Sequence, residues 1–215
     1  MSNKIKLDIV SDVVCPWCVI GYKNLQKAID ELGVGDNIDL QWQPFELNPG
    51  MPVEGQDLRE HVAEKYGSSL QESSAARINI TQRGAEAGFT FNFFEGMTIV
   101  NTRDAHILLE YAHQFGLQTE LKLRLFTAAF TDKKDVSNRE TLLNEVALVG
   151  LDVDQAKVHL QDAQYRDEVV KQEQYWQSLG ISAVPAVVFN RTSAMSGAQS
   201  VEAYKQALTE LLAVK

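Results

Sequence analysis

The only two cysteines of this 215-residue chain, Cys15 and Cys18, enclose a Pro-Trp dipeptide near its beginning. Thiols at this spacing serve as half of a zinc site, as a structural disulfide or as a redox-active pair. A structural zinc ion needs further ligands, and none of the four histidines lies beside the cysteines in sequence. A bridge across two residues closes too small a loop to constrain the unfolded chain much. The spacing therefore favours a redox pair.

The residues on either side of the pair predict a βαβ unit. Apolar and polar residues alternate over residues 5–10, as in a strand with a buried face. A helical period begins at Pro16, where the missing N–H costs nothing, and it stops at Gly33. Residues 38–45 alternate again. Two strands joined by one helix are expected to be parallel.

The joint between strand and helix gives the two thiols different roles. Cys15 would lie beside the unsatisfied N–H groups at the positive end of the helix, so we expect an exposed sulfur with a pKa below ~8.5. Cys18 would lie on the same side, one turn deeper and less exposed. We therefore expect Cys15 to attack a disulfide and Cys18 to resolve the mixed disulfide.

The rest of the chain predicts a helical middle and a second mixed unit at the end. The aromatic segment 89–94 is expected to be a loop between helices. Strand patterns return at 186–189 and 194–197, before a helix over 201–212 that Ser200 caps. The helices expected in the middle cover residues 57–66, 69–87, 102–115, 118–130, 138–149 and 153–179.

Composition excludes several classes of function. The formal net charge of −9 argues against a nucleic-acid partner, because such proteins concentrate Lys and Arg on one face. No apolar run approaches the roughly 18–20 residues of a membrane-spanning helix. The first residues lack the apolar stretch of a signal peptide, so we expect no membrane association and a cytoplasmic location.

Four motifs together resemble the DsbA family of oxidoreductases, and most closely its cytosolic FrnE-type branch. They lie at Ser11–Cys18 (SDVVCPWC), Pro44–Pro49, Asn101–His106 and Gly197–Gln199. The resemblance implies an α/β protein with a thioredoxin fold (βαβ…ββα). Residues 1–46 and 180–215 would form the thioredoxin-like domain, and residues 47–179 would form a large all-helical insertion.

The resemblance also implies a function and a substrate groove. The chain would be a DsbA-like protein disulfide oxidoreductase that uses Cys15 and Cys18 on protein or small-molecule disulfides. The peptide bond before Pro185 would be cis and would expose a backbone edge beside the thiols. Val184 and Pro185 would shape the groove, and Trp17 would offer a contact surface for the partner.

Three further residues are candidates for supporting roles. Pro16 starts the helix that carries the pair. Asp12 precedes Cys15 by three residues, so it would pass protons or oppose thiolate formation, or else bind local backbone N–H groups as an ordinary turn residue. His106 would line the cleft beneath the helical insertion or, as the favoured alternative, be a satisfied helix histidine.

Two other classes of function stay open. A kappa-type glutathione-dependent isomerase or transferase has the same fold and insertion, but it typically carries serine where this chain has its first cysteine. A holdase or partner-binding module with redox-sensing thiols would keep its activity without either cysteine. For the redox function we expect no metal and no bound cofactor, with glutathione or another thiol as the redox partner.

Overall fold

A four-stranded sheet forms one half of the molecule in the computed structural model, which describes residues 4–213. Its strand order is β2-β1-β5-β6. The first two strands pair in parallel, as predicted, and the other neighbours pair antiparallel. The strands are β1 (Ile5–Ser11), β2 (Ile38–Pro44), β5 (Ala186–Phe189) and β6 (Ser193–Ser196).

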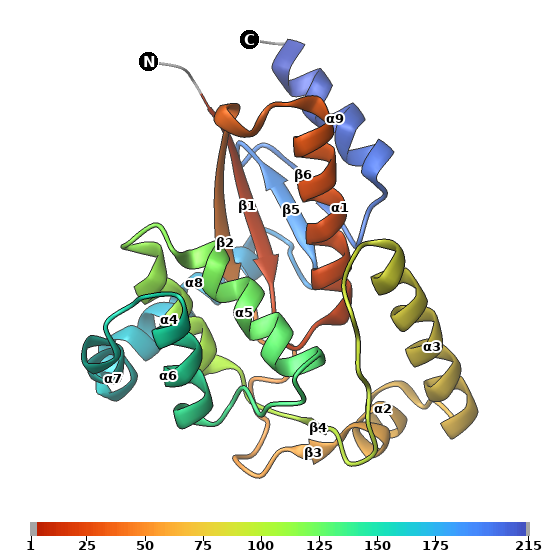
Figure 1. Cartoon of the computed structure of the whole chain (residues 1–215), viewed down its shortest axis with the longest axis vertical. Helices are drawn as coiled ribbons and strands as arrows, with labels where there is room; N and C mark the ends of the chain where they lie inside the picture. Colours follow the sequence, from red (N-terminus) through yellow and green to blue (C-terminus); the bar gives the residue numbers. More distant parts are fainter. Residues whose placement is uncertain (1–3, 214–215) are drawn as a thin grey trace.

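Helices cover both faces of this sheet (Figure 1). Helices α1 (Pro16–Leu32) and α9 (Val201–Ala213) pack together on one face, where alternate residues of β1 such as Ile9 enter the main core. On the other face of the sheet, Val10 of β1 belongs to a second hydrophobic cluster, which also contains Trp176 of α8 (Ala163–Ser178). Both faces of β1 are therefore buried, which fixes the strand that leads into the cysteine pair.

The segment between β2 and β5 is mostly helical, but it is not all-helical as predicted. Its short strands β3 (Gln56–Asp57) and β4 (Thr98–Ile99) form an antiparallel pair. Its helices besides α8 are α2 (Leu58–Tyr66), α3 (Leu70–Glu86), α4 (Arg103–His113), α5 (Gln118–Phe130), α6 (Arg139–Leu148) and α7 (Val153–Gln161).

Two local predictions have different outcomes. The single helix expected over 153–179 is wrong, because Asp162 interrupts it and its carboxylate accepts a hydrogen bond from the N–H of Gln164 to begin α8. The expected aromatic loop is confirmed: residues 89–94 form no helix or strand, and the buried Phe91 packs against the ring of Phe130. That loop closes the space between α3 and α5.

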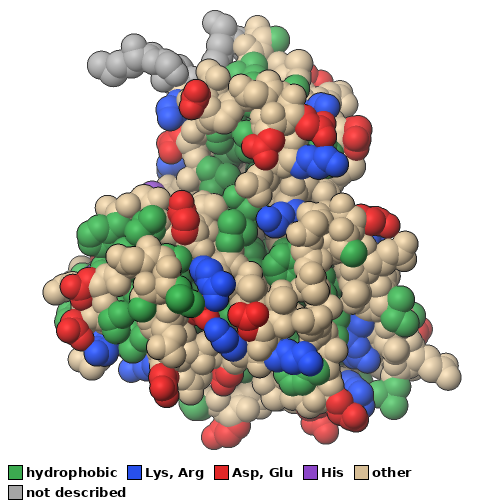
Figure 2. Space-filling view, viewed as in Figure 1, with side chains coloured by type: hydrophobic (Ala, Val, Ile, Leu, Met, Phe, Trp, Pro, Cys, Tyr) green, Lys and Arg blue, Asp and Glu red, His purple; other side chains and the backbone are tan. Residues whose placement is uncertain are grey.

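The arrangement of the two halves places the cysteines at their junction. Strand β1 runs towards the helical segment, and α1 starts at that end (Figure 1). The molecule is narrower at the end that holds both termini, and acidic and basic side chains are interspersed over the face seen in Figure 2. Within the described residues, no helix combines the length and hydropathy that crossing a bilayer requires.

Candidate active site

Cys15 occupies the N-cap position of α1, directly before Pro16. A tight turn after β1 brings it there, with the N–H of Cys15 donating to the carbonyl of Asp12 at 3.3 Å. The two cysteines are free thiols that approach within 3.2 Å of each other. The sequence thus folds locally into a strand, a turn and a helix that hold both sulfurs together in the reduced form.

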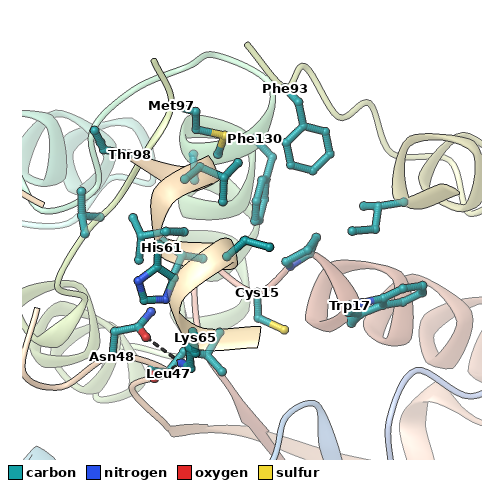
Figure 3. Close-up of a pocket in the computed structure, with 18 of the residues that line it drawn as sticks. Cys15, Trp17, Leu47, Asn48, His61, Lys65, Phe93, Met97, Thr98 and Phe130 are labelled. Carbon is teal, nitrogen blue, oxygen red and sulfur yellow. Dashed lines mark hydrogen bonds between the residues drawn. The ribbon is translucent and has the colours of Figure 1, made fainter. Parts of the chain in front are cut away.

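Access distinguishes the two thiols, although neither is exposed. Cys15 is 4% and Cys18 is 1% accessible, so the expectation of an exposed Cys15 sulfur is wrong. Cys15 nevertheless lines a cavity of about 830 Å³ between the sheet and the helical segment, whereas Cys18 does not. Figure 3 shows its sulfur directed into this space, with Trp17 on the same helix. A reagent in the cavity meets Cys15 first.

The electrostatics of the pair differ from the prediction. The hydrogen bond with Cys18, burial and the nearby Asp12 carboxylate raise the pKa of Cys15 well above its usual value. The backbone N–H of Cys18 acts in the opposite direction, as expected at a helix terminus, but it is outweighed. Burial also raises the pKa of Cys18, yet hydrogen bonds from Cys15 and Ser11 and the charge of Lys122 lower it overall. The reduced pair therefore holds its first negative charge on the Cys18 side.

Lys122, which the sequence analysis did not single out, lies behind the pair. It belongs to α5 and is fully buried, and its Nζ donates to the carbonyl of Ser11 at 3.3 Å. Burial lowers the pKa of its ammonium group to about 8, while Cys18 and Asp12 act to raise it. The sequence does contain a signal for this residue: Lys122 lies in the apolar stripe of its helix together with Phe126. A lysine at such a position is a candidate functional residue, because Lys is rarely buried without a partner.

Asp12 and His106 meet in the buried turn that precedes Cys15, and neither side chain lines the cavity. Asp12 Oδ2 accepts from the N–H of Leu47, so its partner is remote in sequence and the local turn interpretation is wrong. His106 Nε2 lies 3.5 Å from Asp12 Oδ1 and 3.1 Å from the carbonyl oxygen of Phe45. The hydrogen bond and charge of His106 lower the pKa of Asp12 despite burial. His106 is thus a satisfied helix histidine, and it does not line the cavity.

The same histidine belongs to a network that fixes the segment after β2. Glu46 is buried and accepts from Arg103 Nε at 2.7 Å and from Asn101 Nδ2 at 3.0 Å. Glu173 of α8 lies close to this carboxylate, and burial together with the charge of Glu46 raises the pKa of Glu173 to about 8. The start of α4 therefore anchors one wall of the cavity. Within residues 4–213, no group of three or more His, Cys, Asp or Glu side chains is arranged to hold a metal ion.

The residues predicted for the substrate groove lie next to Cys15. The Val184–Pro185 peptide bond is cis, and the carbonyl oxygen of Val184 lies 3.9 Å from Cys15 Sγ. The carbonyl of Pro185 accepts from the N–H of Gly197 at 2.8 Å, which ties this turn to β6. Val184 and Trp17 both line the cavity. The structure thus brings all the predicted site residues around one thiol pair.

A thioredoxin-like sheet with paired thiols at the start of its first helix defines the class of protein. The sequence profile of the DSBA-like thioredoxin domain matches residues 6–209, so the chain belongs to that family. The predicted fold class, a thioredoxin fold with a large insertion, is confirmed. Family membership makes the chain a DsbA-like oxidoreductase in the broad sense.

Individual relatives agree with this assignment. A probable DsbA oxidoreductase from Streptomyces coelicolor superposes with a TM-score of 0.92 at 30% identity, over 98% of this chain and 91% of that one. The cytosolic disulfide reductase DsbM from Pseudomonas aeruginosa, solved with GSH, gives a TM-score of 0.66 at 16% identity, over 96% and 98% of the two chains. The uncharacterized protein YwbO of Bacillus subtilis is 24% identical over 96% of each chain.

Proposed function

We propose that the protein is a thiol–disulfide oxidoreductase in which Cys15 is the nucleophile and Cys18 the resolving thiol. The observation that supports this assignment best is the asymmetry of access. Cys15 lines the cavity, while Cys18 lies behind it next to Ser11 and the buried Lys122. A pair with one accessible and one protected sulfur suits a reaction that begins with an external disulfide and ends with an internal one.

The resting charge on Cys18 is compatible with attack by Cys15. The thiol of Cys15 hydrogen-bonds the Cys18 sulfur, so its proton moves to Cys18 as Cys15 attacks. The new Cys15–S–S–R bond forms and R–S⁻ leaves. Cys18 then passes its proton to the released R–S⁻ or to water, is stabilised as a thiolate by the positive charge of Lys122, and attacks Cys15 Sγ. The internal disulfide forms, a second R–S⁻ leaves, and the substrate has been reduced by two electrons.

The remaining parts of the proposal concern partners and location. Trp17 and Val184 contact the substrate, because they line the cavity with Cys15, and Pro185 shapes the edge that Val184 offers. Glutathione or another thiol returns the pair to the reduced state, with no metal or bound cofactor required. The similarity in fold to DsbM, which is described as cytosolic and was solved with GSH, supports a thiol partner and a cytoplasmic location. Membership of the FrnE-type branch is also part of this proposal.

Trapping of the mixed disulfide tests the roles of the two thiols. With Cys18→Ser, Cys15 should still react with a disulfide such as oxidised glutathione, but the adduct should accumulate because no thiol resolves it. Cys15→Ser should form far less adduct, since Cys18 is shielded from the cavity. Mass spectrometry of the intact protein measures both. Equal adduct yields from the two variants would refute the assignment of roles.

The same variants separate this function from the other two classes. A glutathione-dependent isomerase or transferase would bind glutathione and retain activity in Cys18→Ser, whereas an oxidoreductase would lose turnover. A holdase would suppress aggregation of a denatured client equally well when both cysteines are replaced. Turnover of insulin reduction that depends on both cysteines supports the proposed function.

A further inference from the structure

The cavity beside Cys15 has room for a whole small molecule. Its volume of about 830 Å³ falls within the range typical of small-molecule sites. Aromatic and apolar side chains from both halves of the molecule line it, with Phe93, Met97 and Phe130 across from Trp17 (Figure 3). An extended protein segment needs only an edge such as Val184. The hollow beyond that edge fits the apolar body of a small molecule.

Three cations at this cavity have no carboxylate partner among the described residues. Lys65 Nζ donates to the carbonyl of Leu47 and to Asn48 Oδ1. Arg77 Nη1 donates to a serine hydroxyl at 3.0 Å, and Lys133 Nζ lies 5.4 Å from the ring centroid of Phe94. Their charges are therefore not neutralised by an ion pair with a carboxylate of the cavity lining. They are available to an anionic ligand.

The acidic residues of the same lining are already engaged. Glu46 pairs with Arg103 at 2.7 Å. The Glu72 carboxylate accepts hydrogen bonds from the backbone and hydroxyl at the start of α3, and Asp135 accepts from Ser137. None of these carboxylates neutralises the three cations. Glu72 and Asp135 keep their charge but direct it at these local donors, so the cavity combines an apolar interior with three cations that no carboxylate pairs.

The cations lie at different parts of the cavity. Lys65 lies next to the segment that contains Leu47, to which its ammonium group donates (Figure 3). Arg77 and Lys133 also line an adjoining hollow under α3, so they mark the other end. A ligand that reaches from the thiol into the cavity passes both positions. Either end offers a counter-charge to a carboxylate.

We propose that this cavity binds a small-molecule thiol or disulfide that carries an aromatic or other apolar body and at least one carboxylate. The inference rests on the proposed function, because it places the sulfur of the ligand at Cys15. In the reaction, Cys15 gives up its proton as described above and forms a disulfide with one sulfur of R–S–S–R, and R–S⁻ leaves with its electron pair. The apolar body occupies the space between Trp17 and Phe130, and the carboxylate binds Lys65 or the pair Arg77 and Lys133.

A comparison of two aromatic disulfides tests the charge preference. 5,5′-Dithiobis(2-nitrobenzoate) carries two carboxylates, and 4,4′-dithiodipyridine is similar in size but uncharged at pH 8. With Cys18→Ser protein, the rate of the first thiol release is measured against probe concentration by stopped flow. We expect a half-saturating concentration about tenfold lower for the dicarboxylate. The double variant Lys65→Gln, Lys133→Gln should remove this difference and leave the reaction of the neutral probe unchanged, whereas the surface control Lys27→Gln should change neither.

Binding without exchange separates this inference from the proposed function. S-methyl 5-thio-2-nitrobenzoate has no disulfide, so calorimetry with the Cys15→Ser protein reports on the cavity alone. Saturable binding that the Lys65→Gln, Lys133→Gln variant weakens about tenfold supports the site whatever the redox chemistry. Absence of binding, or equal half-saturation for both disulfide probes, overturns the proposal. Failure of Cys15 to react with either disulfide, with binding retained, contradicts the proposed function instead.

Discussion

Replacement of Lys122 by methionine isolates its charge from its packing. The side chain is fully buried, with its Nζ 5.2 Å and 5.1 Å from the ring centroids of Trp42 and Phe126. Methionine has a similar length and is apolar, so it fills this space without the ammonium group. The main polar loss is the hydrogen bond to the carbonyl of Ser11. Folding should therefore persist.

The expected effect falls on the resolving step. The charge of Lys122 helps to lower the pKa of Cys18, so neutralising Lys122 should raise that pKa. An opposite charge close to an acid typically has an effect of about 1–3 pKa units. The thiolate fraction near pH 7 falls about tenfold per unit, but a more basic thiolate is more nucleophilic. With a Brønsted coefficient of ~0.4–0.5, the net loss is about 3–4-fold per unit. For a charge effect at the lower end of the usual range, the Lys122→Met protein should resolve the mixed disulfide about 3–15-fold more slowly.

The assay follows release of the second thionitrobenzoate after stoichiometric reaction with 5,5′-dithiobis(2-nitrobenzoate). The first release reports attack by Cys15 and the second reports attack by Cys18. Because burial lowers the pKa of Lys122 to about 8, wild-type protein itself loses the charge as pH rises through this value. The rate difference should be largest below pH 8 and shrink above it. Lys122→Arg should resolve the mixed disulfide as fast as wild type below pH 8 and, because arginine keeps its charge, should retain the advantage over methionine above it. A rate ratio that stays constant from pH 6 to 10, or an arginine variant as slow as methionine, would refute the role of the charge.

Two further predictions concern stability. The folded pKa of Glu173 is about 8 and its unfolded value is near 4.5, so the native state binds more protons between these values and loses stability as pH rises through them. Glu173→Gln removes the repulsion with Glu46 and should raise the free energy of unfolding at pH 9 by about 1–3 kcal/mol, with little gain at pH 4, by urea titration. Gly84→Ala places a methyl group against the ring of Phe91 and should lower the free energy of unfolding by about 1–3 kcal/mol. The control Gly50→Ala places its methyl group in open space and should change the free energy of unfolding little. Equal melting temperatures for the two alanine variants would contradict the contact with Phe91.

Local signals in the sequence determine most of the secondary structure and the identity of the thiol pair. The alternation over residues 5–10, Pro16 at the start of a helical period and the two cysteines are all features within a few residues of one another. Such features depend on backbone geometry and side-chain period, which neighbouring residues set. The resemblance of four motifs to the DsbA family added the prediction of the fold and of the substrate groove at Pro185. The break at Asp162 was missed because two helical periods adjoin without glycine or proline between them.

Tertiary structure alone decided the electrostatics and the cavity. Lys122 donates a hydrogen bond to the carbonyl of Ser11, and Asp12 accepts one from the N–H of Leu47. In both cases the partners are too far apart in sequence for a local pattern to predict the contact. The pKa order of Cys15 and Cys18 follows from these contacts, because burial removes the solvent that would otherwise screen each charge. A helix terminus favours a thiolate at Cys15 when it is considered alone. The groups that fold around it move the charge to Cys18.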